Sequence, residues 1–93
     1  MEIETLISAL EDAVGFLQTS DPSYWSHTSV HELIAKLETE IARARNLEPI
    51  DIETLRILFA PTGAIQETAI DNGWGREFLR IAEVVDRFIG NDK

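Results

Sequence analysis

The chain has 93 residues, of which 44% are hydrophobic and 27% charged, and it contains no cysteine. This length suits one globular domain, and the lack of cysteine excludes a disulfide framework, a thiolate nucleophile and a zinc–thiolate site. Eight basic and seventeen acidic residues give a net charge of −9, which repels phosphate backbones and argues against nucleic-acid binding.

The acidic excess is spread along the chain. Residues 1–46 carry eight acids and three bases, and residues 47–93 carry nine acids and five bases. Such charge keeps a protein soluble, and it would also steer a basic protein partner. The amino-terminal residues lack the basic start and apolar run of a secretory signal, and no stretch could span a bilayer. We therefore expect a cytoplasmic protein without a membrane segment.

An apolar stripe predicts the first helix. Its residues recur at alternating spacings of four and three, which is typical of an amphipathic helix. They are Ile3, Ile7, Leu10, Val14 and Leu17, with Leu6, Ala13 and Phe16 beside them. The pattern ends at residues 18–23, where Asp21-Pro22 is a turn signal.

The second predicted helix begins near Ser29, which forms a capping box with Glu32. Arg43 and Arg45 occupy its last turn, where positive charge suits the helix dipole. Its apolar stripe consists of Val30, Ile34, Leu37, Ile41 and Ala44, with Leu33 beside it.

Two or three further elements follow. Asp51 is a suitable cap for a short third helix, which residues 60–63 end. Residues 64–71 are expected to form one or two turns, ended by Asn72-Gly73. A last helix is expected from residue 74 or 75 to Ile89. Its inward residues would be Phe78, Ile81, Ala82, Val85 and Phe88.

No segment alternates polar and apolar residues with a period of two, so we expect little or no β-sheet. The sequence predicts an all-α fold, an irregular antiparallel bundle of four helices in which the third helix is short. Broad apolar stripes place the first and last helices near the centre. They also leave apolar surface that could pair two copies of the chain.

His27 and His31 lie four residues apart and would share one face of a helix that begins at Ser26. This spacing can chelate a divalent metal, but a site needs a third ligand, and the His-Glu-x-x-His pattern is absent. The histidines are equally explained as cover for a helix start. We predict no cofactor and treat the pair only as a weak metal candidate. No phosphate-binding loop or serine elbow occurs either, which favours a non-catalytic protein.

The segment from Leu58 to Gly75 holds three of the five glycines and one of the two tryptophans. It has two interpretations. In one it is a structural corner, where Trp74 plugs the end of the bundle and polar side chains cap exposed amides. In the other it is a recognition surface with Trp74 as anchor. The candidate binding residues are Tyr24, Trp25, Thr62, Gly63, Gln66, Glu67, Asp71, Asn72 and Trp74.

The same motifs carry a resemblance. In chain order they are Tyr24-Trp25-Ser26, Leu58-Phe59-Ala60-Pro61-Thr62-Gly63, Gln66-Glu67 and Ile70-Asp71-Asn72-Gly73-Trp74-Gly75. They cover the last three quarters of the chain, and this order resembles an uncharacterised family of small bacterial domains. The family has no established activity, so the resemblance implies no catalytic residue. In composition alone, the chain is also similar to immunity proteins that neutralise bacterial toxins.

Three functions remain open at this point. The first is a non-catalytic protein-binding module, such as an immunity-type or regulatory partner of a basic protein. The second is a small-ligand-binding protein or small enzyme, with a pocket between Tyr24, Trp25, His27, His31 and residues 61–75. The third is a structural subunit of a homo-oligomer. The exposure of Trp74 bears on the first, because a buried Trp74 removes the main argument for a binding surface at residues 61–75.

Overall fold

All the secondary structure in the described residues is helical, as the sequence predicts. The computed structural model describes residues 2–21, 29–60 and 63–90. No helix within these ranges is long and apolar enough to cross a membrane. The helices are α1 (Glu2–Gln18), α2 (Val30–Arg45), α3 (Ile52–Leu58), α4 (Ala64–Asp71) and α5 (Gly75–Gly90).

The described residues contain five helices and not the expected four, because residues 64–71 form a helix of their own. This helix, α4, has eight residues and buries Ile65, Thr68 and Ala69. An apolar face this short gives too few repeats for periodicity to separate a helix from a pair of turns. Packing against α5 and α1 supplies what the local pattern lacks.

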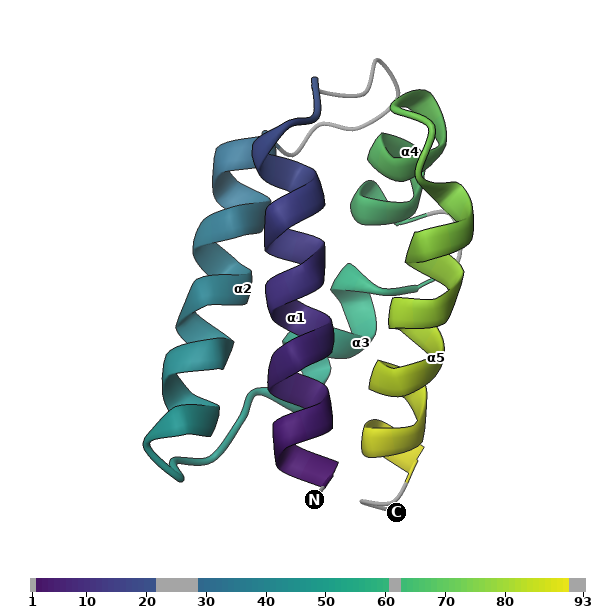
Figure 1. The fold of residues 1–93 in the computed structure, drawn as a ribbon. Helices are drawn as coiled ribbons and strands as arrows, with labels where there is room; N and C mark the ends of the chain where they lie inside the picture. The colour runs from purple at the N-terminus through teal and green to yellow at the C-terminus, as the bar shows by residue number, and fades with distance from the viewer. Residues whose placement is uncertain (1, 22–28, 61–62, 91–93) are drawn as a thin grey trace.

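α1 is the central helix of the molecule (Figure 1). It runs the length of the molecule, and α2 and α5 pack on either side of it and run in the opposite direction. α3 and α4 both pack against α5, on the far side of the α1–α5 pair in Figure 1, and α4 also contacts α1. The first and last helices therefore pack directly against each other, as their broad apolar stripes indicate.

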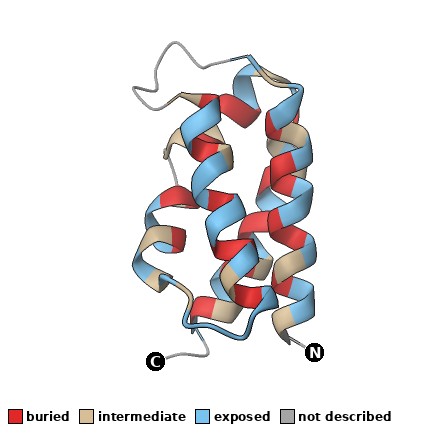
Figure 2. Cartoon of the chain, turned by 90° about the vertical axis from the view of Figure 1, so that its left-hand side faces the viewer, coloured by how far each residue is buried: buried red, intermediate tan, exposed pale blue. Residues whose placement is uncertain are grey.

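Buried residues follow one side of each helix (Figure 2). In α1, Leu6, Leu10 and Leu17 are fully buried, whereas Ile3 and Ile7 are half-buried. The centre of the α1 stripe is therefore displaced from the expected line towards Leu6. The periodic pattern alone cannot decide between these two adjacent lines, because both repeat at helical spacing.

Two predicted helix starts are confirmed. The Ser29 side chain accepts a hydrogen bond from the backbone N–H of Glu32 at 3.1 Å and caps α2. The Asp51 carboxylate accepts one from the backbone N–H of Thr54 at 3.0 Å and caps α3. This bond stabilises the charged carboxylate and lowers the pKa of Asp51 below its ordinary value of 3.8.

Candidate functional site

Trp74 lies inside the molecule. Only 5% of its surface is exposed. Its ring stacks on that of Phe16 in α1, with centroids 4.9 Å apart and planes inclined by 11°. The indole Nε1–H donates a hydrogen bond to the Ser20 hydroxyl at 2.8 Å. Both the apolar body and the polar edge of the side chain are therefore used within the fold, and Trp74 is not an exposed anchor.

Asn72 ties the chain just after α1 to the end of α4. Its Oδ1 accepts a hydrogen bond from the backbone N–H of Asp21 at 2.9 Å. Its Nδ2 donates to the backbone oxygens of Asp21 and Thr68, each at 2.9 Å. The amide thus pairs with the backbone of Asp21 as a neighbouring strand would. Together with Trp74, Asn72 makes this end of the molecule the structural corner of the first interpretation.

Two glycines of the same segment serve backbone geometry. A Cβ at Gly63 would lie 2.9 Å from the carbonyl oxygen of Ala60 and 3.2 Å from that of Ile57, so a side chain would not fit. Gly73 has a φ of 83°, in the left-handed region that glycine adopts most readily. It follows the end of α4, where the backbone N–H of Trp74 donates to the carbonyl oxygen of Ala69 at 2.9 Å. This bond and the left-handed residue form a Schellman motif.

Three further predicted site residues lie on α4, and three lie outside the described residues. Gln66 and Glu67 are half-buried on α4, and Asp71 is exposed at its end. Tyr24, Trp25 and Thr62 lie outside the described residues. Among the predicted site residues that the structure describes, Trp74 packs on α1 and Asn72 binds the backbone just after it. A binding role for Gln66, Glu67 and Asp71 stays a prediction.

Of the two histidines, His31 is exposed in the first turn of α2 and His27 lies outside the described residues. The pair, and the ligand pocket expected beside it, therefore stay predictions. Within the described ranges, no three side chains of histidine, cysteine, aspartate or glutamate are grouped so that they could hold a metal ion.

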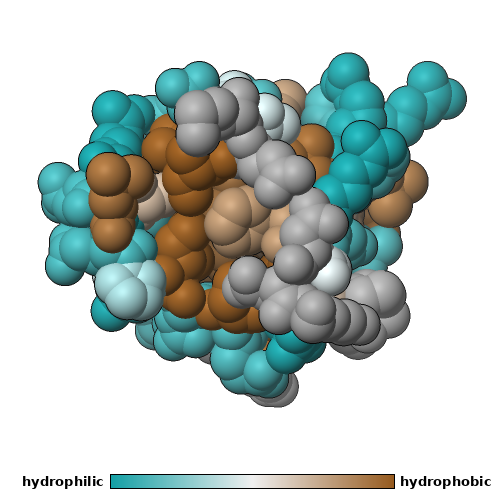
Figure 3. Space-filling view, turned by 90° about the horizontal axis from the view of Figure 1, so that it is seen from below, coloured by the Kyte–Doolittle hydropathy of each residue, from teal (hydrophilic) through white to brown (hydrophobic). Residues whose placement is uncertain are grey.

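The opposite end of the molecule carries an apolar surface that contains none of the predicted binding residues. A hollow of about 390 Å³ opens there, where α1 begins and α2 and α5 end. Viewed from this end, hydrophobic side chains gather near the centre of the face, with hydrophilic ones beside them (Figure 3). We call this surface the Leu47 face. Its lining residues are Ile3, Ala44, Leu47, Glu48, Pro49, Ile50, Ile52 and Phe88.

Leu47 is the most exposed large apolar residue of the described chain, at 85%. Its φ is 57°, and it is the only residue other than glycine with a positive φ in these ranges. It stands at the end of α2, where the backbone N–H of Glu48 donates to the carbonyl oxygen of Arg43 at 2.8 Å and that of Leu47 to Ala44 at 3.2 Å. This is again a Schellman motif, with leucine where glycine is usual. A left-handed conformation costs an L-residue about 1–2 kcal/mol.

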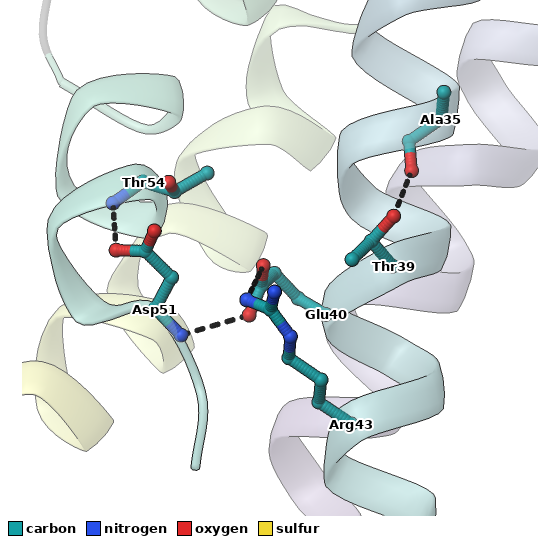
Figure 4. Close-up of polar contacts among 6 residues, drawn as sticks. All are labelled: Ala35, Thr39, Glu40, Arg43, Asp51 and Thr54. Atoms are coloured by element: carbon teal, nitrogen blue, oxygen red, sulfur yellow. Dashed lines mark hydrogen bonds and ion pairs between the residues drawn. The ribbon is translucent and has the colours of Figure 1, made fainter. Parts of the chain in front are cut away.

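A buried glutamate fixes the connection that carries Leu47. Glu40 of α2 is only 3% exposed. Its carboxylate accepts a hydrogen bond from the backbone N–H of Asp51 at 2.8 Å and pairs with the Arg43 guanidinium at 2.9 Å (Figure 4). Residues 46–51 are therefore held at one end by the Schellman motif and at the other by Glu40. The Leu47 face is presented on a connection that is anchored at both ends.

Glu40 and Leu47 were both missed in the sequence, for different reasons. Glu40 had a readable signal, because Leu33, Leu37, Glu40 and Ala44 recur at spacings of four, three and four, and all four are buried. An acidic side chain within a buried line of a helix needs hydrogen-bonding or charged partners, because without them its burial would strongly destabilise the folded protein. Leu47 had no comparable signal, since the left-handed position after a helix is usually marked by glycine or asparagine.

Comparison with known proteins adds no family to this geometry: no protein-family model matches the chain, and no curated protein or solved structure matches it significantly. The described residues form an all-α fold.

Proposed function

We propose that this protein is a non-catalytic protein-binding module that docks its partner on the Leu47 face. Leu47 is the observation that carries the proposal. It is a leucine that is 85% exposed and held in a left-handed conformation. Single exposed apolar residues are ordinary on protein surfaces, but this one borders a hollow lined almost entirely by apolar side chains.

The conformation of Leu47 supports a role outside the fold. Glycine would close the same helix end with less strain, and the exposed leucine side chain buries little apolar area in return. Strained backbone that the fold does not require is concentrated at functional sites in proteins. An interface explains both features, because the side chain would be buried in the complex and the strain would be offset there.

The chemistry of the partner follows from the surface and the charge. The Leu47 face would accept an apolar side chain as an anchor, and Glu48 is the one charged residue of its lining. The net charge of −9 would speed the approach of a basic protein and would discourage a second copy of the chain. For this chain, the role of an immunity-type or regulatory protein that binds a basic partner in a cytoplasmic setting fits these properties. A chain without cysteine is also suited to a reducing compartment.

The proposal is tested with two matched substitutions. Leu47→Asn removes the apolar side chain and keeps the left-handed conformation accessible, since asparagine tolerates it. Leu79→Asn makes the same change at a residue of α5 that is 59% exposed and lies outside the Leu47 face. Each protein is tagged, cross-linked in lysate of the producing cells and analysed by mass spectrometry. We expect a partner that wild type and Leu79→Asn retain and Leu47→Asn loses.

Equal retention by both variants would contradict the proposal. Light scattering at several concentrations separates it from the homo-oligomer alternative. A dimer that Leu47→Asn abolishes would assign the face to a second copy and would overturn the choice of a basic partner.

A further inference from the structure

A second open surface lies along the α1–α5 pair. A hollow of about 630 Å³ runs between these helices, and its lining contains no residue of α3 or α4. On the α1 side the lining reaches from Glu4 to Phe16, a length of about 18 Å at 1.5 Å per residue. We call it the α1–α5 groove. Its lining shares no residue with that of the Leu47 face.

The α1–α5 groove has an apolar floor and an acidic border. Ala9 and Ile81 are buried at its base, and Phe16 and Val84 are half-buried beside them. Glu4 and Asp12 lie on the α1 side, and Glu77 lies on the α5 side. Arg80 is the one basic residue in the lining. None of the ion pairs formed within the described residues uses Glu4, Asp12 or Glu77.

We propose that the α1–α5 groove binds a helix of a partner protein that has basic residues on both sides of an apolar stripe. Two packed helices leave a groove of the kind into which the ridge of a third helix fits. An amphipathic helix would place its apolar stripe on Ala9, Ile81 and Val84, as in other helix-in-groove complexes. The length of the α1 side matches about three turns of such a helix.

The charge around the groove determines which charge the bound helix must carry. Three carboxylates against one guanidinium border the groove, and the whole chain carries −9. Lysine or arginine beside the stripe would face Glu4 and Asp12 on one side and Glu77 on the other. A second copy of this chain would bring more carboxylates to the same place, and like charges in an interface are destabilising.

Synthetic peptides supply the probe. The first is an amphipathic helix of leucine and lysine about four turns long, the second has glutamate in place of lysine, and the third is a scrambled form of the first. Affinity is measured by fluorescence anisotropy at low and at raised NaCl. We expect only the first peptide to bind tightly, with an affinity that falls as salt rises.

Two double variants with the same net charge locate the binding. Asp12→Asn/Glu77→Gln removes two carboxylates of the groove, and Glu32→Gln/Glu38→Gln removes two exposed carboxylates of α2. We expect the first double variant to lower the affinity for the leucine–lysine peptide about tenfold. The second should change this affinity less than about twofold. Ser8→Arg, within the groove, should abolish binding, whereas Ala35→Arg on α2 adds the same charge and should not.

Several results would contradict the proposal that the α1–α5 groove binds a basic helix. Equal weakening by the two double variants would mean that the peptide senses only the overall charge. Equal affinity for the scrambled peptide would exclude a helical occupant. The Leu47→Asn variant keeps the two proposals apart, because it should leave the peptide affinity unchanged. Loss of the peptide in Leu47→Asn would contradict the groove without deciding the function of the Leu47 face.

Discussion

The ends of α2 and α4 share one backbone motif but differ in the residue at its left-handed position. Both close with a Schellman motif and a left-handed residue, Leu47 after α2 and Gly73 after α4. After α4, glycine meets the conformational demand and the next residue, Trp74, is buried. After α2, a leucine takes the left-handed position and lies 85% exposed. One end is built for stability, whereas the other departs from stability in a way that an interface would explain.

The largest expected effect concerns Trp74, which is buried at the end of the molecule where α4 ends. Trp74→Ala should lower the free energy of unfolding by about 3–5 kcal/mol, because it leaves a cavity and removes the stacking on Phe16. Trp74→Phe keeps a ring there and should cost less, the remaining loss coming from the hydrogen bond to Ser20. Urea denaturation measures both. A loss below about 1 kcal/mol for Trp74→Ala would show that this corner does not stabilise the fold.

The next effect concerns the anchor of the Leu47 connection. Glu40→Ala leaves the backbone N–H of Asp51 and the Arg43 guanidinium without their carboxylate, and it should cost about 1–3 kcal/mol. Glu38→Ala, at an exposed position of the same helix, is the control and should lie within about 0.5 kcal/mol of wild type. Hydrogen exchange should also speed up at residues 47–51 in the Glu40 variant. Unchanged exchange there would mean that the connection is held by other contacts.

A pair of opposite substitutions compares the two left-handed positions directly. Gly73→Leu should destabilise the protein by about 1–2 kcal/mol, because a leucine there must adopt a positive φ. Leu47→Gly should stabilise it by up to about 1 kcal/mol, since relief of strain outweighs the extra freedom of glycine in the unfolded chain. Thermal unfolding records both shifts in Tm. A lower Tm for Leu47→Gly would mean that the leucine side chain stabilises the monomer and is not kept for binding.

The smallest effect is a pH dependence at the start of α3. The folded state lowers the pKa of Asp51, so its contribution to stability is present above the unfolded value, near 3.8, and is lost as pH falls through the folded pKa. Asp51→Asn still caps the helix but cannot titrate. Its stability should therefore fall less steeply than that of wild type below about pH 4. Identical profiles in acid would show that the carboxylate charge does not contribute.

Local patterns predicted most of the fold. The helices over residues 2–18, 30–45 and 75–90 follow from apolar repeats that are long enough to be periodic, and Ser29 and Asp51 cap the helices that follow them. α4 was harder to predict because its apolar face is short. The candidate site could be predicted only in part. The unusual composition of residues 61–75 was evident, but composition cannot distinguish a corner from a binding surface.

The sequence by itself determined the helical class, the main helix boundaries and the acidity, because these depend on neighbours within a few residues or on no neighbours at all. Tertiary structure alone decided that Trp74 is buried and Leu47 exposed. Burial of Trp74 depends on Phe16 and Ser20, more than fifty residues earlier in the chain. Exposure of Leu47 depends on how α2 ends and on the Glu40 carboxylate that holds Asp51. Such contacts join distant segments, and no local pattern in the sequence records them.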